Sequence, residues 1–172
     1  MNEAYTGTQC APDKVVERCT QDSAATQALG AALSTCVQPG QVIALTGDLG
    51  AGKTTFVQGL AAGLGFTGQV TSPTFVLVNE YLLPNRRRLI HIDAYRLDPG
   101  ADAALTEAAT FGLEDLFDND DAIVAIEWSE RVTAALPADH LQVELQATDA
   151  DTRVIRICAF GAQSAAALAR LP

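Results

Sequence analysis

The sequence predicts an α/β domain in which a mixed β-sheet lies between two layers of helices, and three patterns indicate this. An apolar run over residues 41–46 leads through a glycine-rich loop into a helical segment over 55–64, the strand–loop–helix order of such domains. The near-continuous apolar run over 122–128 is typical of a strand that is covered on both faces. Apolar-rich runs over 75–82 and 88–93 are joined by a short link, which predicts an antiparallel hairpin.

The glycine-rich loop, GDLGAGKT over residues 47–54, fits the P-loop pattern G-x-x-x-x-G-K-[ST] at every fixed position. Its glycines permit positive φ angles, so that successive backbone N–H groups can point inward at phosphate oxygens. Lys53 supplies a charge that can reach the β- and γ-phosphates, and the Thr54 hydroxyl can bind Mg²⁺. The loop therefore predicts a P-loop NTPase-type fold. The residues expected to hold the nucleotide are Asp48, Leu49, Gly50, Ala51, Gly52, Lys53, Thr54 and Thr55.

The positions of the lysines support the P-loop assignment and bear on the choice between ATP and GTP. The chain has only two lysines, Lys14 and Lys53, and its other basic residues are arginines. The one lysine in the middle of the chain is therefore the one that the P-loop requires. A guanine-reading segment of the [NT]-K-x-D type needs a lysine before an aspartate, and neither lysine lies in such a segment. This favours ATP over GTP as the ligand, with Mg²⁺.

Composition favours one globular domain without a membrane segment. The chain has 172 residues, of which 48% are hydrophobic, enough for a single domain with a core. We expect residues 1–13 to form a flexible polar leader and residues 14–172 to form one P-loop ATPase domain. The first residues lack the positive region and apolar core of a signal peptide, and no apolar run approaches the roughly 20 residues that span a bilayer. The expected location is the cytoplasm, without membrane contact.

The acidic charge of the chain argues against direct binding of nucleic acid. The formal net charge is −10 and the isoelectric point is about 4.4, whereas a protein that binds nucleic acid by itself usually carries a basic face. Any role on RNA is therefore expected to run through a protein partner. Three consecutive arginines, Arg86 to Arg88, lie at the predicted hairpin turn. They are interpreted as a solvated tip, with a partner or RNA contact as the alternative.

The remaining segments complete the α/β pattern. We expect a first strand over residues 14–19 and then a helix over 24–33, whose N-cap is Asp22 or Ser23. Apolar periodicity predicts further helices over 103–109, 112–117 and 164–171, and a half-exposed strand pair over 141–145 and 154–158.

Two carboxylates are expected beside the P-loop because each ends a predicted strand. Ligands of α/β sheets collect at the carboxyl ends of parallel strands. Glu127 ends the apolar run and fits a Mg²⁺-binding position, and Asp93 ends the second strand of the hairpin. Asp93 could hold a metal-bound water or orient the attacking water. For both, the alternative is a strand-end carboxylate that caps a turn.

Four other side chains are weighed as part of the site. Ser72 and Thr74 lie after the P-loop helix, in a region where many P-loop proteins sense the γ-phosphate; the alternative is a pair of turn hydroxyls. Trp128 follows Glu127 and either forms a wall of the site, contacts a partner, or packs in the core. His91 is interpreted as structural.

Five short blocks occur in this order along the chain: GDLGAGKTTF at 47–56, TSPTF at 71–75, HIDAYRL at 91–97, FGLE at 111–114 and IEW at 126–128. In this combination, over about residues 15–160, the chain resembles the TsaE family (the YjeE type), the bacterial ATPases of the tRNA threonylcarbamoyladenosine pathway. The combination is far more specific than a P-loop alone. The resemblance implies a P-loop α/β domain with a partly antiparallel sheet.

The resemblance also implies an activity, partners and residue roles. It implies weak ATP hydrolysis, stimulated by TsaB and TsaD type proteins, whose complex modifies adenosine 37 of tRNAs. The chain is then an energy-coupling accessory subunit that meets tRNA only indirectly. The implied roles are phosphate binding by Asp48 to Thr54, catalysis by Lys53, Asp93 and Glu127, Mg²⁺ binding by Thr54 and Glu127, nucleotide contacts by Ser23 and Arg153, and a place at the edge of the site for Trp128.

Two other functions stay open at this point. A small P-loop kinase would share the phosphate site but needs a second-substrate site, commonly under an arginine-rich lid. A nucleotide-gated binding module would use ATP binding, without required hydrolysis, to set its affinity for a partner.

Overall fold

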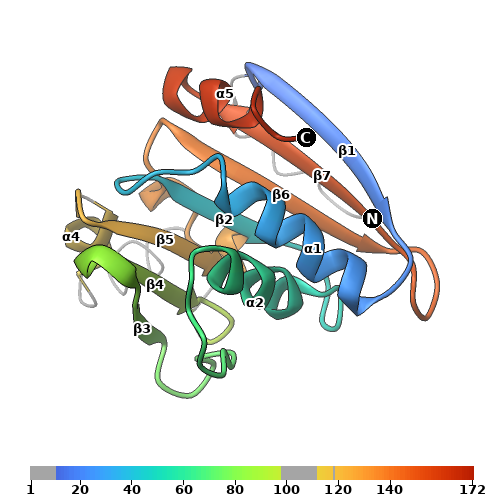
Figure 1. Ribbon diagram of the computed structural model, residues 1–172, viewed down its shortest axis with the longest axis horizontal. Coiled ribbons are helices and arrows are strands. Elements are labelled where there is room, and N and C mark those ends of the chain that lie inside the picture. Colours follow the sequence, from blue (N-terminus) through green and yellow to red (C-terminus); the bar gives the residue numbers. More distant parts are fainter. Residues whose placement is uncertain (1–10, 98–111, 118) are drawn as a thin grey trace.

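The computed structural model describes residues 11–97, 112–117 and 119–172, and the seven strands in these ranges form one sheet (Figure 1). The strand order is β1-β7-β6-β2-β5-β4-β3. β2 is parallel to β5 and β6, and β4 is parallel to β5, whereas the β1–β7, β6–β7 and β3–β4 pairs are antiparallel. The predicted mixed sheet with an antiparallel hairpin is therefore confirmed. The strands are β1 (Lys14–Thr20), β2 (Val42–Thr46), β3 (Val78–Leu82), β4 (Arg88–Asp93), β5 (Ala122–Glu127), β6 (His140–Ala147) and β7 (Arg153–Phe160).

Helices pack on both faces of this sheet. Alternate residues of β2 separate the two cores, because successive side chains of a strand point to opposite faces. Ile43 and Leu45 pack in the core that includes residues of α1 (Ser23–Ser34), α2 (Lys53–Gly63) and α5 (Ala162–Leu168). Val42 and Ala44 pack in the core on the other face, which includes residues of α4 (Leu113–Phe117) and of the segments after β4 and β5. This confirms the three-layer arrangement. None of the helices in the described ranges is long and apolar enough to cross a bilayer.

Glycines let α1 and α2 approach each other closely. A Cβ atom at Gly59 would lie 1.9 Å from the Gln27 carbonyl oxygen, and one at Gly30 would lie 2.3 Å from the Phe56 carbonyl oxygen. Any larger side chain would push the helices apart. The contact sets the start of α1 beside the start of α2, as Figure 1 shows. The N-cap of α1 is Asp22, whose Oδ1 accepts a 2.7 Å hydrogen bond from the Ala25 N–H.

One predicted strand is shorter in the structure. The strand expected over 75–82 begins only at Val78, because the preceding residues form a tight turn. The N–H groups of Val76 and Leu77 both donate to the Pro73 carbonyl, at 2.9 and 2.7 Å, and Leu77 has a φ of 68°. This turn leaves Phe75 83% exposed. It also determines where the Thr74 side chain lies, as described below.

Other predicted boundaries shift by a few residues or fall outside the described ranges. The last helix covers residues 162–168 instead of 164–171, and the final strand pair is longer at both ends than predicted. The helix expected over 103–109 and the leader up to residue 10 lie outside the described residues. The hairpin link is a short 3-10 helix, Pro84–Arg86. After it Arg88 pairs with Glu80 at 3.1 Å and with Asp121 at 2.9 Å, at the end of β4 away from Asp93.

Candidate functional site

The P-loop connects β2 to α2 and has the backbone that its sequence predicts. Gly47, Gly50 and Gly52 have φ angles of 136°, 79° and 105°, in a region that residues other than glycine rarely adopt. Gly47 has a second constraint, since a Cβ atom there would lie 2.3 Å from the Leu145 carbonyl oxygen on β6. The loop conformation is therefore built from the glycines of the motif.

Lys53 is held inside this loop. The residue is only 4% exposed, and its Nζ donates to the carbonyl oxygens of Gly47 at 2.6 Å and Asp48 at 3.0 Å. The same Nζ lies 3.7 Å from the centre of the Trp128 ring, a cation–π contact. Burial lowers the pKa of Lys53, and the nearby carboxylate of Glu127 opposes this shift. The ammonium group is thus close to the loop, the indole and an acidic strand end at once.

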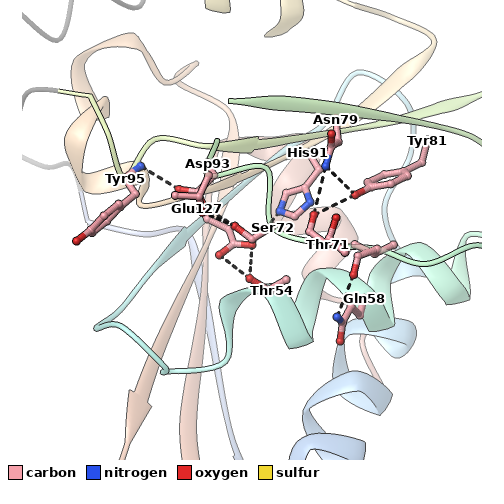
Figure 2. A network of polar contacts seen from close by, with 12 residues as sticks. Thr54, Gln58, Thr71, Ser72, Asn79, Tyr81, His91, Asp93, Tyr95 and Glu127 are labelled. Carbon is pink, nitrogen blue, oxygen red and sulfur yellow. Dashed lines mark hydrogen bonds and ion pairs between the residues drawn. The ribbon is translucent and has the colours of Figure 1, made fainter. Parts of the chain in front are cut away.

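Glu127 ends β5 next to the start of α2, and Thr54 contacts it directly. The Thr54 hydroxyl donates to the carboxylate, with distances of 2.8 Å to Oε1 and 3.0 Å to Oε2. Glu127 is 3% exposed, and its Oε1 also lies 2.8 Å from Nε2 of His91, which is fully buried. Figure 2 shows the Glu127 carboxylate between Thr54 and His91. The interpretation of His91 as structural is therefore incomplete, because this side chain contacts a predicted metal ligand.

Asp93 ends β4 and lies opposite Glu127 in the register of the two strands. Its Oδ2 accepts hydrogen bonds from the hydroxyls of Ser72 and Thr74, both at 2.5 Å. Its Oδ1 accepts one from the Tyr95 N–H at 2.9 Å. The loop after α2 is thereby fixed to the second strand-end carboxylate, in the network drawn in Figure 2.

These groups face a cleft of about 520 Å³, within the roughly 300–1,000 Å³ range of ligand pockets. Most predicted site residues line it, together with Ser72 and Tyr95. Tyr95 was missed by sequence reasoning, although it lies in the HIDAYRL block two residues after Asp93. The lining residues are Leu49, Gly50, Gly52, Lys53, Thr54, Thr55, Ser72, Thr74, Asp93, Tyr95, Glu127 and Trp128.

Four predicted residues lie outside the lining of this cleft. Asp48 is exposed on the loop and Ala51 is buried under it. Ser23 and Arg153 line a smaller hollow of about 190 Å³, which shares Gly50 and other P-loop residues with the main cleft.

The hydrogen bonds that Arg153 donates all go to backbone carbonyl oxygens of the described residues. Its Nε donates to the Ala51 carbonyl at 3.0 Å and its Nη2 to the Gly50 carbonyl at 3.3 Å. Its Nη1 donates to carbonyl oxygens of the turn before β7. The guanidinium therefore braces the P-loop from the side of the smaller hollow.

Trp128 and Tyr95 form an aromatic wall of the cleft, with ring centroids 5.0 Å apart. Trp128 has a left-handed backbone, with φ 58° and ψ 38°, which few non-glycine residues adopt. The sharp turn directs the chain away from β5 immediately after Glu127. Two large apolar side chains near the cleft are exposed, since Leu49, which lines it, and Phe75, next to the lining residue Thr74, are both 83% exposed.

A metal ion at this site would depend on the nucleotide. Within the described ranges no group of three or more His, Cys, Asp and Glu side chains could hold a metal. Thr54 and Glu127 instead bring one hydroxyl and one carboxylate together. Mg²⁺ in nucleotide sites is typically bound by one or two protein oxygens, waters and the substrate phosphates. The residues present fit Mg²⁺ that arrives with a phosphate ligand.

We expect nucleotide binding to change the intrinsic fluorescence of the chain. Trp128 is the only tryptophan, and a phosphate that attracts Lys53 removes the cation–π contact on its ring. Titration with ATP and Mg²⁺ should give a saturable change in emission, whereas adenosine, which has no phosphate, should give none at the same concentration. Calorimetric binding of ATP without any change in emission would contradict this arrangement of Lys53 and Trp128.

The chain is similar to known proteins in sequence and in structure. The family described as threonylcarbamoyl adenosine biosynthesis protein TsaE matches residues 20–155. A tRNA threonylcarbamoyladenosine biosynthesis protein TsaE of a Nostoc species is 40% identical over 151 residues, which are 86% of this chain and 88% of that protein. The protein of the same name from Bacillus subtilis is 37% identical over 139 residues, 79% of this chain and 80% of that protein. The crystal structure of Bacillus subtilis YdiB matches with a TM-score of 0.76 and 30% identity, covering 92% of this chain and 94% of that one.

Proposed function

The chain belongs to the TsaE family of tRNA threonylcarbamoyladenosine biosynthesis proteins, and from this premise we propose that it is an ATP-hydrolysing accessory subunit of that machinery. The observation that carries the proposal is the contact between Thr54 and Glu127 at the mouth of a complete P-loop. It supports a site that holds phosphates and a metal ion together. We further propose that residues 14–172 form one ATPase domain, that residues 1–13 are a leader, and that the protein acts in the cytoplasm.

Phosphate binding is assigned to the P-loop. The backbone N–H groups of Asp48 to Thr54 and the charge of Lys53 bind the phosphates, and Thr55 extends the contact at the start of α2. Thr54 and Glu127 would hold Mg²⁺. When bound, Mg²⁺ neutralises charge on the phosphate oxygens. Ser23 and Arg153, in the smaller hollow beside the loop, are assigned to the nucleoside side of ATP.

Hydrolysis needs a group that orients water, and we assign this to Asp93. Its carboxylate lines the cleft, in register with Glu127, and is only 2% exposed. Hydrogen bonds from Ser72, Thr74 and the Tyr95 N–H hold both of its oxygens, so its orientation depends on the loop after α2. A partner that moves this loop would therefore change the position of Asp93. Such coupling suits an ATPase that is weak alone and stimulated in a complex.

We propose TsaB and TsaD type proteins as the partners, and tRNA as an indirect one. The exposed apolar side chains of Leu49 and Phe75 beside the cleft support contact with a protein, because large apolar groups at a polar site favour burial in an interface. The net charge of −10 argues against a bare phosphate backbone as the first contact.

The proposal is tested by ATP turnover with and without the partners. Purified protein with Mg²⁺ should hydrolyse ATP slowly, and addition of the TsaB and TsaD type proteins of the same organism should raise the rate at least about 10-fold, as expected when a partner completes a catalytic site. Addition of either partner alone serves as a control. No turnover under any of these conditions would refute the ATPase assignment. Transfer of the γ-phosphate to a small acceptor would favour the kinase instead.

A further inference from the structure

We propose that His91 is a positioning residue that orients the Glu127 carboxylate for the metal ion. The inference rests on the proposed function, since it requires Glu127 to be a Mg²⁺ ligand. It concerns a side chain on β4, a different strand from the one that carries Glu127. His91 therefore belongs neither to the P-loop nor to β5, the two segments from which the metal ligands were predicted.

The distances indicate that His91 and Thr54 hold the same carboxylate oxygen. Oε1 of Glu127 lies 2.8 Å from the Thr54 hydroxyl and 2.8 Å from Nε2 of His91. A carboxylate oxygen has two lone pairs in its plane, so both are occupied on Oε1. Among the described residues, Oε2 contacts Thr54 alone, at the longer distance of 3.0 Å. Oε2 is therefore the oxygen with a lone pair left for a cation.

The burial of the pair shows which nitrogen of His91 donates. The side chains of His91 and Glu127 are 0% and 4% exposed, and within the described residues Nδ1 of His91 has no hydrogen-bond partner. A proton on Nδ1 alone would leave a buried donor unsatisfied and set the Nε2 lone pair against a carboxylate. Either is costly for a buried group. The hydrogen bond therefore runs from the Nε2–H to Oε1.

This hydrogen bond fixes the carboxylate independently of the P-loop. Thr54 is itself a proposed metal ligand, and its single hydroxyl proton is shared between Oε1 and Oε2 of Glu127. His91 approaches from the opposite side in Figure 2, and its ring is confined by complete burial in the sheet. Partners that orient a metal ligand in this way commonly contribute 10–100-fold to metal affinity. A side chain that only fills space would contribute nothing to it.

The experiment measures Mn²⁺ affinity by electron paramagnetic resonance in the presence of saturating ADP. His91→Gln carries an amide nitrogen near the position of Nε2, whereas His91→Asn is one carbon too short and His91→Leu has no donor. We expect the Asn and Leu variants to bind Mn²⁺ about 10–100-fold more weakly and the Gln variant to recover most of the loss. Affinity for ADP in EDTA should be equal in all of them, because the phosphate-binding loop is unchanged.

The matched control is His140→Leu, since His140 is the only other histidine. It lies at the start of β6, level with the beginning of β2 and thus at the far end of the sheet from the cleft. This variant should bind Mn²⁺ like the wild type. If His91→Leu does not fold, the comparison of Gln with Asn decides alone.

Three results would overturn the inference, and they show whether the proposed function fails with it. Unchanged Mn²⁺ affinity in all His91 variants, with affinity lost in Glu127→Gln, would refute the role of His91 and leave the proposed function standing. Equal losses in the Gln and Asn variants would do the same, because they would indicate packing and not donation. Wild-type protein with ADP that binds no Mn²⁺ would refute the metal assignment itself, and the His91 role with it.

Discussion

Lys53→Ala should lower ATP turnover by about 10²–10³-fold and weaken the binding of ATP and ADP. The residue supplies the one lysine charge at the loop, and removing a donor aimed at developing phosphate charge typically costs this much. The effect should appear both in the rate at saturating ATP and in nucleotide affinity, because Lys53 contacts phosphates before and during hydrolysis. Phosphate release and calorimetry measure the two quantities.

Lys14→Ala is the matched control for this substitution. Lys14 is the only other lysine and lies at the start of the edge strand β1. It should leave turnover and binding unchanged. The fold should survive Lys53→Ala, because burial lowers the pKa of Lys53 and hence disfavours its charged form in the folded protein. A variant with wild-type melting temperature and wild-type turnover would show that the loop does not bind the reacting phosphates.

The sequence pattern was sufficient to predict the P-loop and the two strand-end carboxylates, because each depends on a short continuous segment. The P-loop follows from glycine spacing, and Gly47, Gly50 and Gly52 have the positive φ angles that the spacing requires. The positions of Asp93 and Glu127 follow from strand ends, and parallel pairing of β4 with β5 brings them opposite each other. The sequence pattern predicts where each strand ends, and the pairing of the strands in the sheet brings the two carboxylates together.

Contacts between residues far apart in the sequence could not be predicted from local patterns. His91 and Glu127 are 36 residues apart, and Ser72 and Asp93 are 21 apart. Such contacts depend on the order of the strands in the sheet. The sequence of residues 88–93 does not show that β4 lies beside β5. A usable signal existed for His91, since residues two apart on a strand share a face and Asp93 was already assigned to the site.

The shortened β3 has a similar cause. Residues 75–82 have the apolar character of a strand, but Pro73 accepts the hydrogen bonds of Val76 and Leu77 and closes a turn instead. The turn leaves Thr74 on Asp93. A local turn therefore overrides strand propensity at the residues that precede β3.

Glu127→Gln should strongly slow hydrolysis while leaving metal-free nucleotide binding intact. Glutamine keeps the shape of the side chain and an oxygen that can accept from His91, but it removes the negative charge that would bind Mg²⁺. We expect turnover in the presence of the partners to fall by about 10²-fold or more. Affinity for ADP in EDTA should stay within about 3-fold of the wild type, because no phosphate-binding group changes. These measurements separate loss of chemistry from loss of binding.

Glu144→Gln is the control, because it makes the same change on β6, a strand that β2 separates from β5. Glu144 pairs with Arg156 at 3.2 Å on the surface, and exposed pairs contribute little to stability. This variant should keep full turnover and the wild-type melting temperature. Turnover of Glu127→Gln within about 3-fold of the control would show that Glu127 is a structural strand-end carboxylate, because loss of a true metal-binding charge costs far more.

The same variant decides between a coupled ATPase and a nucleotide-gated binding module. A cell that depends on this protein needs either repeated hydrolysis or only the ATP-bound state. We expect Glu127→Gln to bind nucleotide without turning it over, and such a variant traps the bound state. If hydrolysis drives the modification cycle, the variant fails to restore growth and also blocks wild-type protein by occupying the partners. If binding alone sets partner affinity, the variant restores growth although its ATPase rate is lost. The ATPase assay and the complementation assay, made on one variant, therefore distinguish the coupled ATPase from the binding module.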